Sequence, residues 1–150
     1  MKIGFTGTQR GLSKFQKESL TKLFSELIVN DRGCEFHQGD CVGADQQANK
    51  INLHEHTWCR RIGHPPTNDR KRAWCSVDEW RIVKPYLERN HDIVDETEVL
   101  IACPKSLVEE QRSGTWATVR YAKSLGKEIY IVWPNGEIKH IEETEELVKW

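Results

Sequence analysis

The sequence lacks the features that mark several large classes of protein. Its 150 residues contain no apolar run close to the length of about 18 residues that a membrane-spanning helix requires, so we expect no membrane association. Its 22 lysines and arginines are balanced by 23 acidic residues. General nucleic-acid binders carry a basic excess, so this balance disfavours nucleic acid as a partner.

Cysteine and histidine are present, but not in the spacings that bind metals. The five cysteines form no CxxC pair, and their odd number argues against a disulfide scaffold. The histidines offer only His54-Glu55-His56, whose spacing is poor for a helical metal site. We therefore expect reduced thiols in a cytoplasmic protein, with no metal and no cofactor. The N-terminal MKIGFTGTQR is too short and too polar for a signal peptide.

Short apolar runs alternate with helical patterns along the chain. A capping box at Ser13 and Gln16 begins one helix, Pro85 begins another, and Gly126 ends the helix that starts at Ser113. Strands are predicted over residues 2–8, 35–38, 57–63, 99–103 and 129–133. A helix follows each of the first, second and fourth strands, and a long loop and the helix at Pro85 follow the third. This order predicts an α/β three-layer sandwich with a mostly parallel sheet of about five strands, in a single domain spanning residues 1–150.

Residues 64–78 show no periodicity, and the end of the chain combines a turn with acidic residues. We interpret 64–78 as a long ordered loop that includes a turn of helix. Asn135-Gly136 predicts a tight turn, and a short acidic helix is expected at the end of the chain.

Three loops should meet where ligands bind in such sheets, at the carboxyl ends of the strands. The clearest is Arg112-Ser113-Gly114-Thr115, which begins a helix and contains no acid. Backbone N–H groups, the helix dipole, two hydroxyls and an arginine would there favour a phosphate. The alternative is an ordinary serine N-cap followed by a glycine needed for packing.

The other two loops follow the first and second strands. Gly7-Thr8-Gln9-Arg10 offers hydrogen-bond donors and a glycine that permits close approach of a ligand, but no GxGxxG fingerprint. The second loop combines the small residues Gly39, Gly43 and Ala44 with Asp40 and Asp45. Its acids would suit ribose hydroxyls; alternatively, Asp40 caps the following helix and Asp45 pairs with N–H groups of its first turn.

The basic segment Asp69-Arg70-Lys71-Arg72-Ala73-Trp74 places positive charge beside an aromatic ring. Trp74 either stacks on a ligand or folds inward beneath a solvated loop.

Taken together, these motifs resemble those of the SLOG superfamily, which includes the Lonely Guy enzymes and the DNA-processing protein Smf. The resemblance covers residues 2–134, is greatest to the small YspA and YpsA branch, and rests on GFTGTQR, HQGDCVGADQQA, HPP, ERNHDIV, LIACP and RSGTWATVRYAKSLGK. It implies a Rossmann-like fold and a nucleotide-derived ligand. It also implies that Arg89 and Asn90 lie near the ligand, together with Gly7–Arg10, Gly39–Asp45 and Arg112–Thr115.

One position departs from the hydrolase pattern of that superfamily. The resemblance places the catalytic glutamate of the Lonely Guy motif at residue 118, where this chain has threonine. The departure favours a nucleotide-binding protein, as a sensor or a sequestering protein, over a phosphoribosyl or N-glycosidic hydrolase. Such a hydrolase would need another carboxylate, which Asp40, Asp45 or Glu88 could supply. A single-stranded nucleic-acid binder is the third alternative, and a homo-oligomer is compatible with the sequence.

Overall fold

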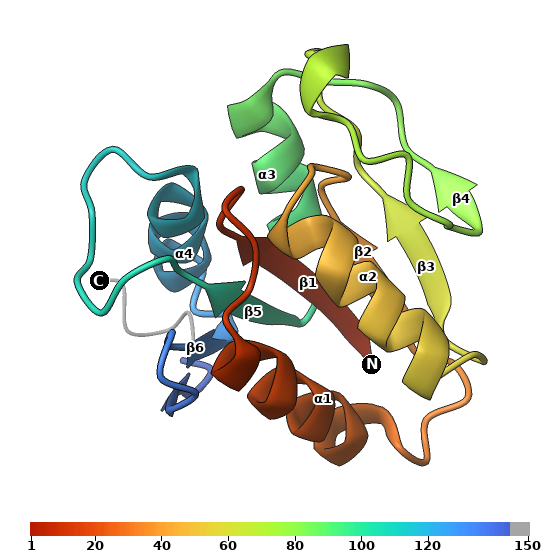
Figure 1. The fold of residues 1–150 in the computed structure, drawn as a ribbon, viewed down its shortest axis with the longest axis vertical. Helices are drawn as coiled ribbons and strands as arrows, with labels where there is room; N and C mark the ends of the chain where they lie inside the picture. The colour runs from red at the N-terminus through yellow and green to blue at the C-terminus, as the bar shows by residue number, and fades with distance from the viewer. Residues whose placement is uncertain (145–150) are drawn as a thin grey trace.

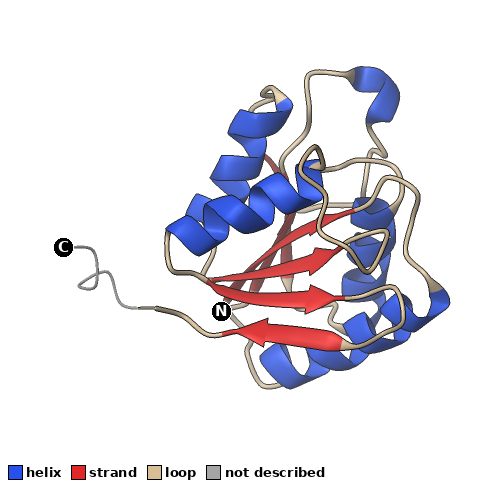
Figure 2. Cartoon of the chain, turned by 90° about the vertical axis from the view of Figure 1, so that its left-hand side faces the viewer, coloured by secondary structure: helices blue, strands red, loops and turns tan. Residues whose placement is uncertain are grey.

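The computed structural model describes residues 1–144, in which the strands form one sheet with helices on both faces (Figures 1 and 2). The strands are β1 (Lys2–Gly7), β2 (Glu35–Gln38), β3 (Arg60–Gly63), β4 (Glu79–Trp80), β5 (Val99–Cys103), β6 (Glu128–Val132) and β7 (Ile138–Ile141). The helices are α1 (Lys14–Ile28), α2 (Ala44–Glu55), α3 (Tyr86–Asp95) and α4 (Gly114–Ser124), with a 3-10 turn over Asp69–Lys71.

The sheet has the order β4-β3-β2-β1-β5-β6-β7, and every neighbouring pair is parallel except β6 and β7. The prediction of about five strands is therefore too low. The five expected strands are present, and a short strand is added at each edge. The 57–63 strand is also shorter than predicted, because it begins at Arg60.

The two additional strands carry little sequence signal. β4 has only two residues, and β7 is exposed at three of its four positions, so neither shows the apolar pattern of a buried strand. β7 is reached through the predicted turn, in which the Gly136 N–H donates to Trp133 O at 2.8 Å. The acidic helix expected at the end of the chain falls largely on residues 145–150, outside the described residues.

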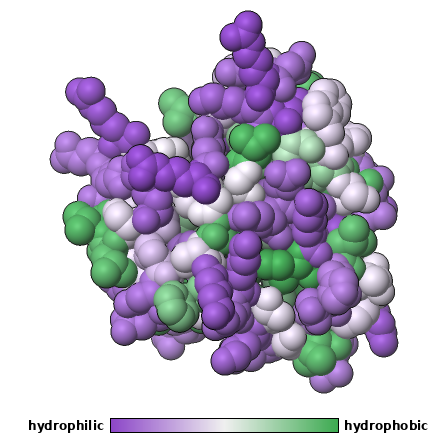
Figure 3. Space-filling model, in the orientation of Figure 1, coloured by the Kyte–Doolittle hydropathy of each residue, from purple (hydrophilic) through white to green (hydrophobic). Residues whose placement is uncertain are grey.

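Two hydrophobic clusters hold the helices against the sheet. One joins Phe5 and Phe36 of the sheet to Leu20 and Phe24 of α1 and to Ala48 of α2. The other packs α4 against β5 and β6 through residues such as Trp116, Val119 and Ile131. The face shown in Figure 3 is mainly hydrophilic, with scattered apolar patches.

The predicted capping box at the start of α1 is confirmed. Ser13 accepts from the Gln16 N–H, and the Gln16 side chain accepts from the Ser13 N–H. The Gln16 amide also donates to Pro104 O and Val132 O, at 2.8 and 3.0 Å. One buried side chain thus ties α1 to the ends of β5 and β6.

The chain direction across the sheet reverses between β1 and β5. From β1 the chain proceeds through β2 to β3 on one side, and it later fills the other side with β5 and β6. In open α/β sheets such a reversal leaves a crevice at the carboxyl ends of the two strands. Within residues 1–144, no helix is both long and apolar enough to cross a bilayer.

Candidate functional site

A cleft of about 390 Å³ opens at the carboxyl ends of β1 and β5. Its floor includes Phe5, Ile93 and Trp116, and its walls come from the loops after β1, β2 and β5. Most of the predicted site residues line it: Gly7, Thr8, Gln9, Arg10, Gly39, Asp45, Arg89, Asn90, Arg112, Ser113, Gly114 and Thr115. Asp40, Gly43 and Ala44 do not.

The first wall is a turn fixed by the backbone of Thr8. Its N–H donates to Cys103 O of β5, and its carbonyl accepts from the Ala44 N–H of α2. A Cβ atom on Gly7 would lie 2.6 Å from the Ala44 Cβ, so glycine is required there by helix packing as well as by any ligand. Gln9 and Arg10 remain exposed at the mouth of the cleft.

The second wall depends on Arg89 of α3, which is only 4% exposed. Its guanidinium donates to the carbonyl oxygens of Gly39 and His64 and to Asn90 Oδ1. A side chain at Gly39 would collide with this guanidinium. A buried arginine, rather than a ligand alone, therefore explains why Gly39 lacks a side chain.

Asp45 is a buried carboxylate in the first turn of α2 that faces this wall. It is 7% exposed, and its Oδ2 accepts from the Cys41 N–H at 3.1 Å. Burial raises the pKa of Asp45 to about 6, although the neighbouring positive charge of Arg89 acts in the opposite direction. The cleft thus contains a carboxyl group that can change its protonation state near neutral pH.

Asp40 has a different environment from the one predicted. It is fully buried and does not line the cleft; it accepts from Arg72 Nε and from the Cys75 N–H, both at 2.8 Å. The alternative that Asp40 caps α2 is also wrong, because Gly43 is the N-cap and receives no side-chain hydrogen bond. Asp40 instead anchors the loop 64–78 to the second wall.

Gly43 and Ala44 lie beneath the cleft. Gly43 has a φ of +96°, and a Cβ there would collide with the backbone of Gln9. The start of α2 therefore packs directly against the loop after β1.

The third wall is the start of α4, for which the sequence left two interpretations open. Ser113 is the N-cap and accepts from the Trp116 N–H at 3.3 Å. Gly114, however, is not a packing glycine, because nothing lies within 4 Å of the position a Cβ would take. Gly114 and Thr115, whose backbone N–H groups have no partner within the helix, both line the cleft.

The structure adds cleft residues that the sequence analysis missed. Lys105 and Glu110 come from the loop between β5 and α4, and Tyr86 comes from the first turn of α3. Tyr86 accepts a 3.0 Å hydrogen bond from the Gln9 amide, which links two walls. Lys105 follows the apolar strand and Pro104 directly, a position that the sequence could have indicated.

The basic segment 69–74 lies outside the cleft lining. The inward orientation considered for Trp74 is wrong, since its side chain is 63% exposed and the Arg72 guanidinium stacks 3.5 Å from its ring centre. The predicted turn of helix in this loop is confirmed as Asp69–Lys71.

Comparison with known proteins finds similarity in structure but not in sequence families. No family model and no curated protein sequence matches this chain. The molybdenum cofactor binding protein of the phototrophic bacterium Rippkaea orientalis is similar in structure, with a TM-score of 0.66 and 20% identity over 88% of this chain and 76% of that one. The structural genomics target TM1055 is similar with a TM-score of 0.59 and 14% identity, over 85% and 71% of the two chains. These likenesses support the Rossmann-like fold implied by the sequence motifs.

Proposed function

We propose that this protein belongs to the SLOG superfamily and binds a nucleotide or a nucleotide-derived, phosphorylated ribose ligand in the cleft. The observation that carries the proposal is the start of α4, where Gly114 presents open backbone to the cleft. A phosphate there would meet N–H donors and the positive end of the helix dipole.

The charges around the cleft favour an anionic ligand. Arg10, Lys105 and Arg112 are exposed residues of its lining, whose two acids are Glu110 and the buried Asp45. Lys105 is already paired with Glu110 at 3.4 Å, so Arg10 and Arg112 are the rim cations best placed to meet a phosphate.

Asp45 supplies the complementary group for a sugar. It lies on the α2 side of the cleft, and a carboxylate accepts hydrogen bonds from ribose hydroxyls. An anion-binding wall and an acid in one cleft match the two ends of a nucleoside phosphate. A molybdenum cofactor binding protein shares this fold, which is consistent with a small-molecule ligand.

The test is the substitution Gly114→Asp. The open space at Gly114 accommodates the side chain, so the fold should be retained, whereas the new carboxylate would repel a phosphate. Thermal shift with a panel of nucleoside mono- and diphosphates should show stabilisation of the unmodified protein that is lost in this variant.

Two control variants test the effect of side-chain size at position 114 and the effect of a negative charge added elsewhere. Gly114→Ala should keep ligand binding, because a methyl group fits the same space. Thr57→Asp adds the same charge at an exposed residue before β3, at the amino ends of the strands and so away from the cleft. This variant should also keep ligand binding. Undiminished ligand binding by Gly114→Asp would contradict the proposal that a phosphate binds at the start of α4.

The alternative of an N-glycosidic or phosphoribosyl hydrolase is favoured by one observation, the buried Asp45. A carboxyl group with a pKa of about 6 is suited to acid–base chemistry at neutral pH. Of the three acids considered from the sequence, Asp40 is held by Arg72 and Glu88 lies outside the cleft lining, so Asp45 is the candidate for that role.

A further inference from the structure

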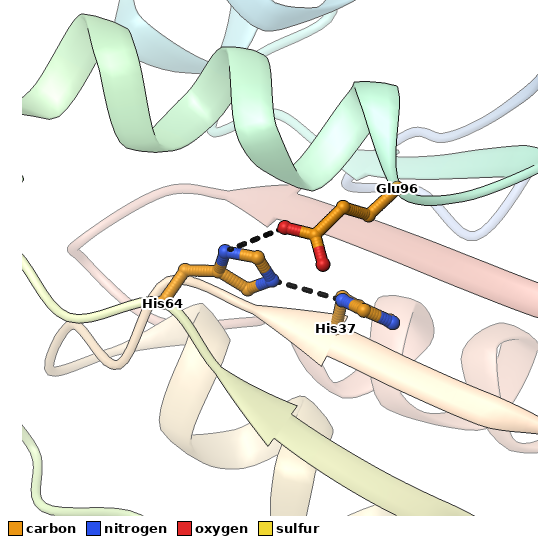
Figure 4. A group of neighbouring side chains, drawn as sticks. All are labelled: His37, His64 and Glu96. Atoms are coloured by element: carbon orange, nitrogen blue, oxygen red, sulfur yellow. Dashed lines mark hydrogen bonds and ion pairs between the residues drawn. The ribbon is translucent and has the colours of Figure 1, made fainter. Parts of the chain in front are cut away.

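A buried cluster on the α3 face of the sheet joins His37 of β2, His64 directly after β3 and Glu96 at the end of α3 (Figure 4). One potential ligand atom from each lies within 4.8 Å of the others. Both histidines are almost fully buried, whereas about a third of the Glu96 side chain is exposed. The cluster is therefore reachable from solvent through Glu96.

Four side chains form a row in which the histidines occupy the centre. Glu35 Oε1 lies 2.9 Å from His37 Nε2, and His37 Nδ1 lies 2.8 Å from His64 Nε2. His64 Nδ1 faces Glu96 Oε2 at 3.9 Å. The row thus has three contacts between nitrogen and either nitrogen or oxygen, with a carboxylate at each end.

Two neutral imidazoles carry one N–H each, which is enough for the two short contacts of the row: His37 can donate to Glu35, and His64 to His37. His64 Nδ1 then keeps a lone pair that faces Glu96 Oε2 at 3.9 Å, which is too far for a hydrogen bond. A cation beside these two groups would interact with both.

Positive side chains near the cluster are paired with acids: Arg81 with Glu79 and Glu96, and Lys84 with Asp92. A metal differs from a proton because it can accept electron pairs from both imidazoles and the carboxylate together.

We propose that His37, His64 and Glu96 bind a divalent transition metal of the zinc class. Two imidazoles and one carboxylate are a donor set that such ions accept, with one or more positions left for water. The surroundings match those of metal-binding histidines, which commonly donate their second N–H to a carboxylate. Glu35 takes this position beside His37. Arg81 holds Glu96 through a 2.8 Å hydrogen bond and a 2.7 Å ion pair.

The site is separate from the cleft. None of the three metal-site residues lines the cleft. The two sites are linked through the His64 carbonyl, which accepts a 3.0 Å hydrogen bond from Arg89 of the second wall. The metal would join β2, β3 and α3 beneath the second wall. This proposal is independent of the proposed nucleotide binding.

The experiment uses the full chain without an affinity tag, treated with a chelator and then given Zn²⁺ or Co²⁺. We expect one equivalent of zinc by elemental analysis after gel filtration, and a rise in Tm with zinc concentration. Co²⁺ should give visible absorption bands without the near-ultraviolet bands of a cobalt–thiolate bond. No stoichiometric binding, or thiolate bands that place the metal on cysteine, would overturn the proposal.

Two variants locate the metal. Glu96→Gln lies at the exposed edge of the cluster, should leave the fold intact, and should weaken zinc binding at least ~10-fold. His64→Gln should abolish the cobalt spectrum. The control His140→Gln removes a more exposed histidine of β7 and should bind zinc normally. Equal zinc affinity in Glu96→Gln and the unmodified protein would contradict the assignment even if His64→Gln failed to fold.

Discussion

The hydroxyl of Thr118 donates a 2.8 Å hydrogen bond to the carbonyl oxygen of Gly114, one turn earlier in α4. Thr118 is 1% exposed and does not line the cleft, so its polar group is satisfied within its own helix. In the Lonely Guy motif that this chain resembles, the same position would carry the catalytic glutamate. Here the start of α4 keeps its open glycine, but it has no proton-transfer group at that position.

We therefore predict that the protein binds its nucleotide without consuming it. A positioned acid or base contributes typically ~10²–10⁴-fold to such a reaction. Purified protein incubated with AMP or ADP-ribose should release less than one equivalent of free base, measured by chromatography. Steady release over many turnovers that disappears in Asp45→Asn would instead place the protein among the hydrolases, with Asp45 in the catalytic role.

Asp45→Asn should weaken ligands that have free ribose hydroxyls more than their deoxy analogues. The carboxylate of Asp45 lies in the cleft lining, and losing one charge-assisted hydrogen bond costs roughly 1.5–3 kcal/mol. Calorimetric titration of matched ribo and deoxy nucleotides measures the difference. An equal loss for both would mean that Asp45 only supports the loop through its bond to the Cys41 N–H.

The same variant should change how stability depends on pH. Folded Asp45 keeps its proton up to about pH 6, whereas an unfolded aspartate releases it near pH 4. Its contribution to stability is therefore fully present below about pH 4 and is lost as pH rises to about 6. Relative to the unmodified protein, the unfolding free energy of Asp45→Asn should rise by about 2 kcal/mol between pH 4 and pH 7.

Urea unfolding at several pH values without ligand provides this measurement. Glu88→Gln is the control, because Glu88 is exposed on α3 and outside the cleft lining. Its pH profile should follow that of the unmodified protein. Parallel profiles for Asp45→Asn would show that the carboxyl group is not held protonated by burial.

Gln16→Leu should destabilise the fold by about 2–4 kcal/mol. The substitution leaves the Ser13 N–H and the carbonyls of Pro104 and Val132 without the partner they share. The control is Gln46→Leu, because the Gln46 side chain makes no hydrogen bond within residues 1–144. This variant should change the free energy of unfolding by less than about 0.5 kcal/mol. Denaturant unfolding compares the two; similar losses would mean that the Gln16 bonds contribute little.

The sequence by itself determined the central strands and the helices, because each is specified by local chemistry. The apolar run of β5, the capping box of α1 and the glycine after α4 are readable without any tertiary contact. The loops that line the cleft followed from the same alternation, since parallel strands bring their carboxyl ends to one edge. The edge strands β4 and β7 were missed because exposed or two-residue strands carry no such pattern.

Only the tertiary structure decided what the polar side chains do. Asp40 and Asp45 are five residues apart in sequence but lie in different environments. Asp40 accepts hydrogen bonds from Arg72 and Cys75 of the loop 64–78, whereas Asp45 lines the cleft near Arg89. His37, His64 and Glu96 come from three separate elements, so no spacing could reveal them. Burial and long-range partners fix the charge and direction of such groups, and those arise only when distant segments pack together.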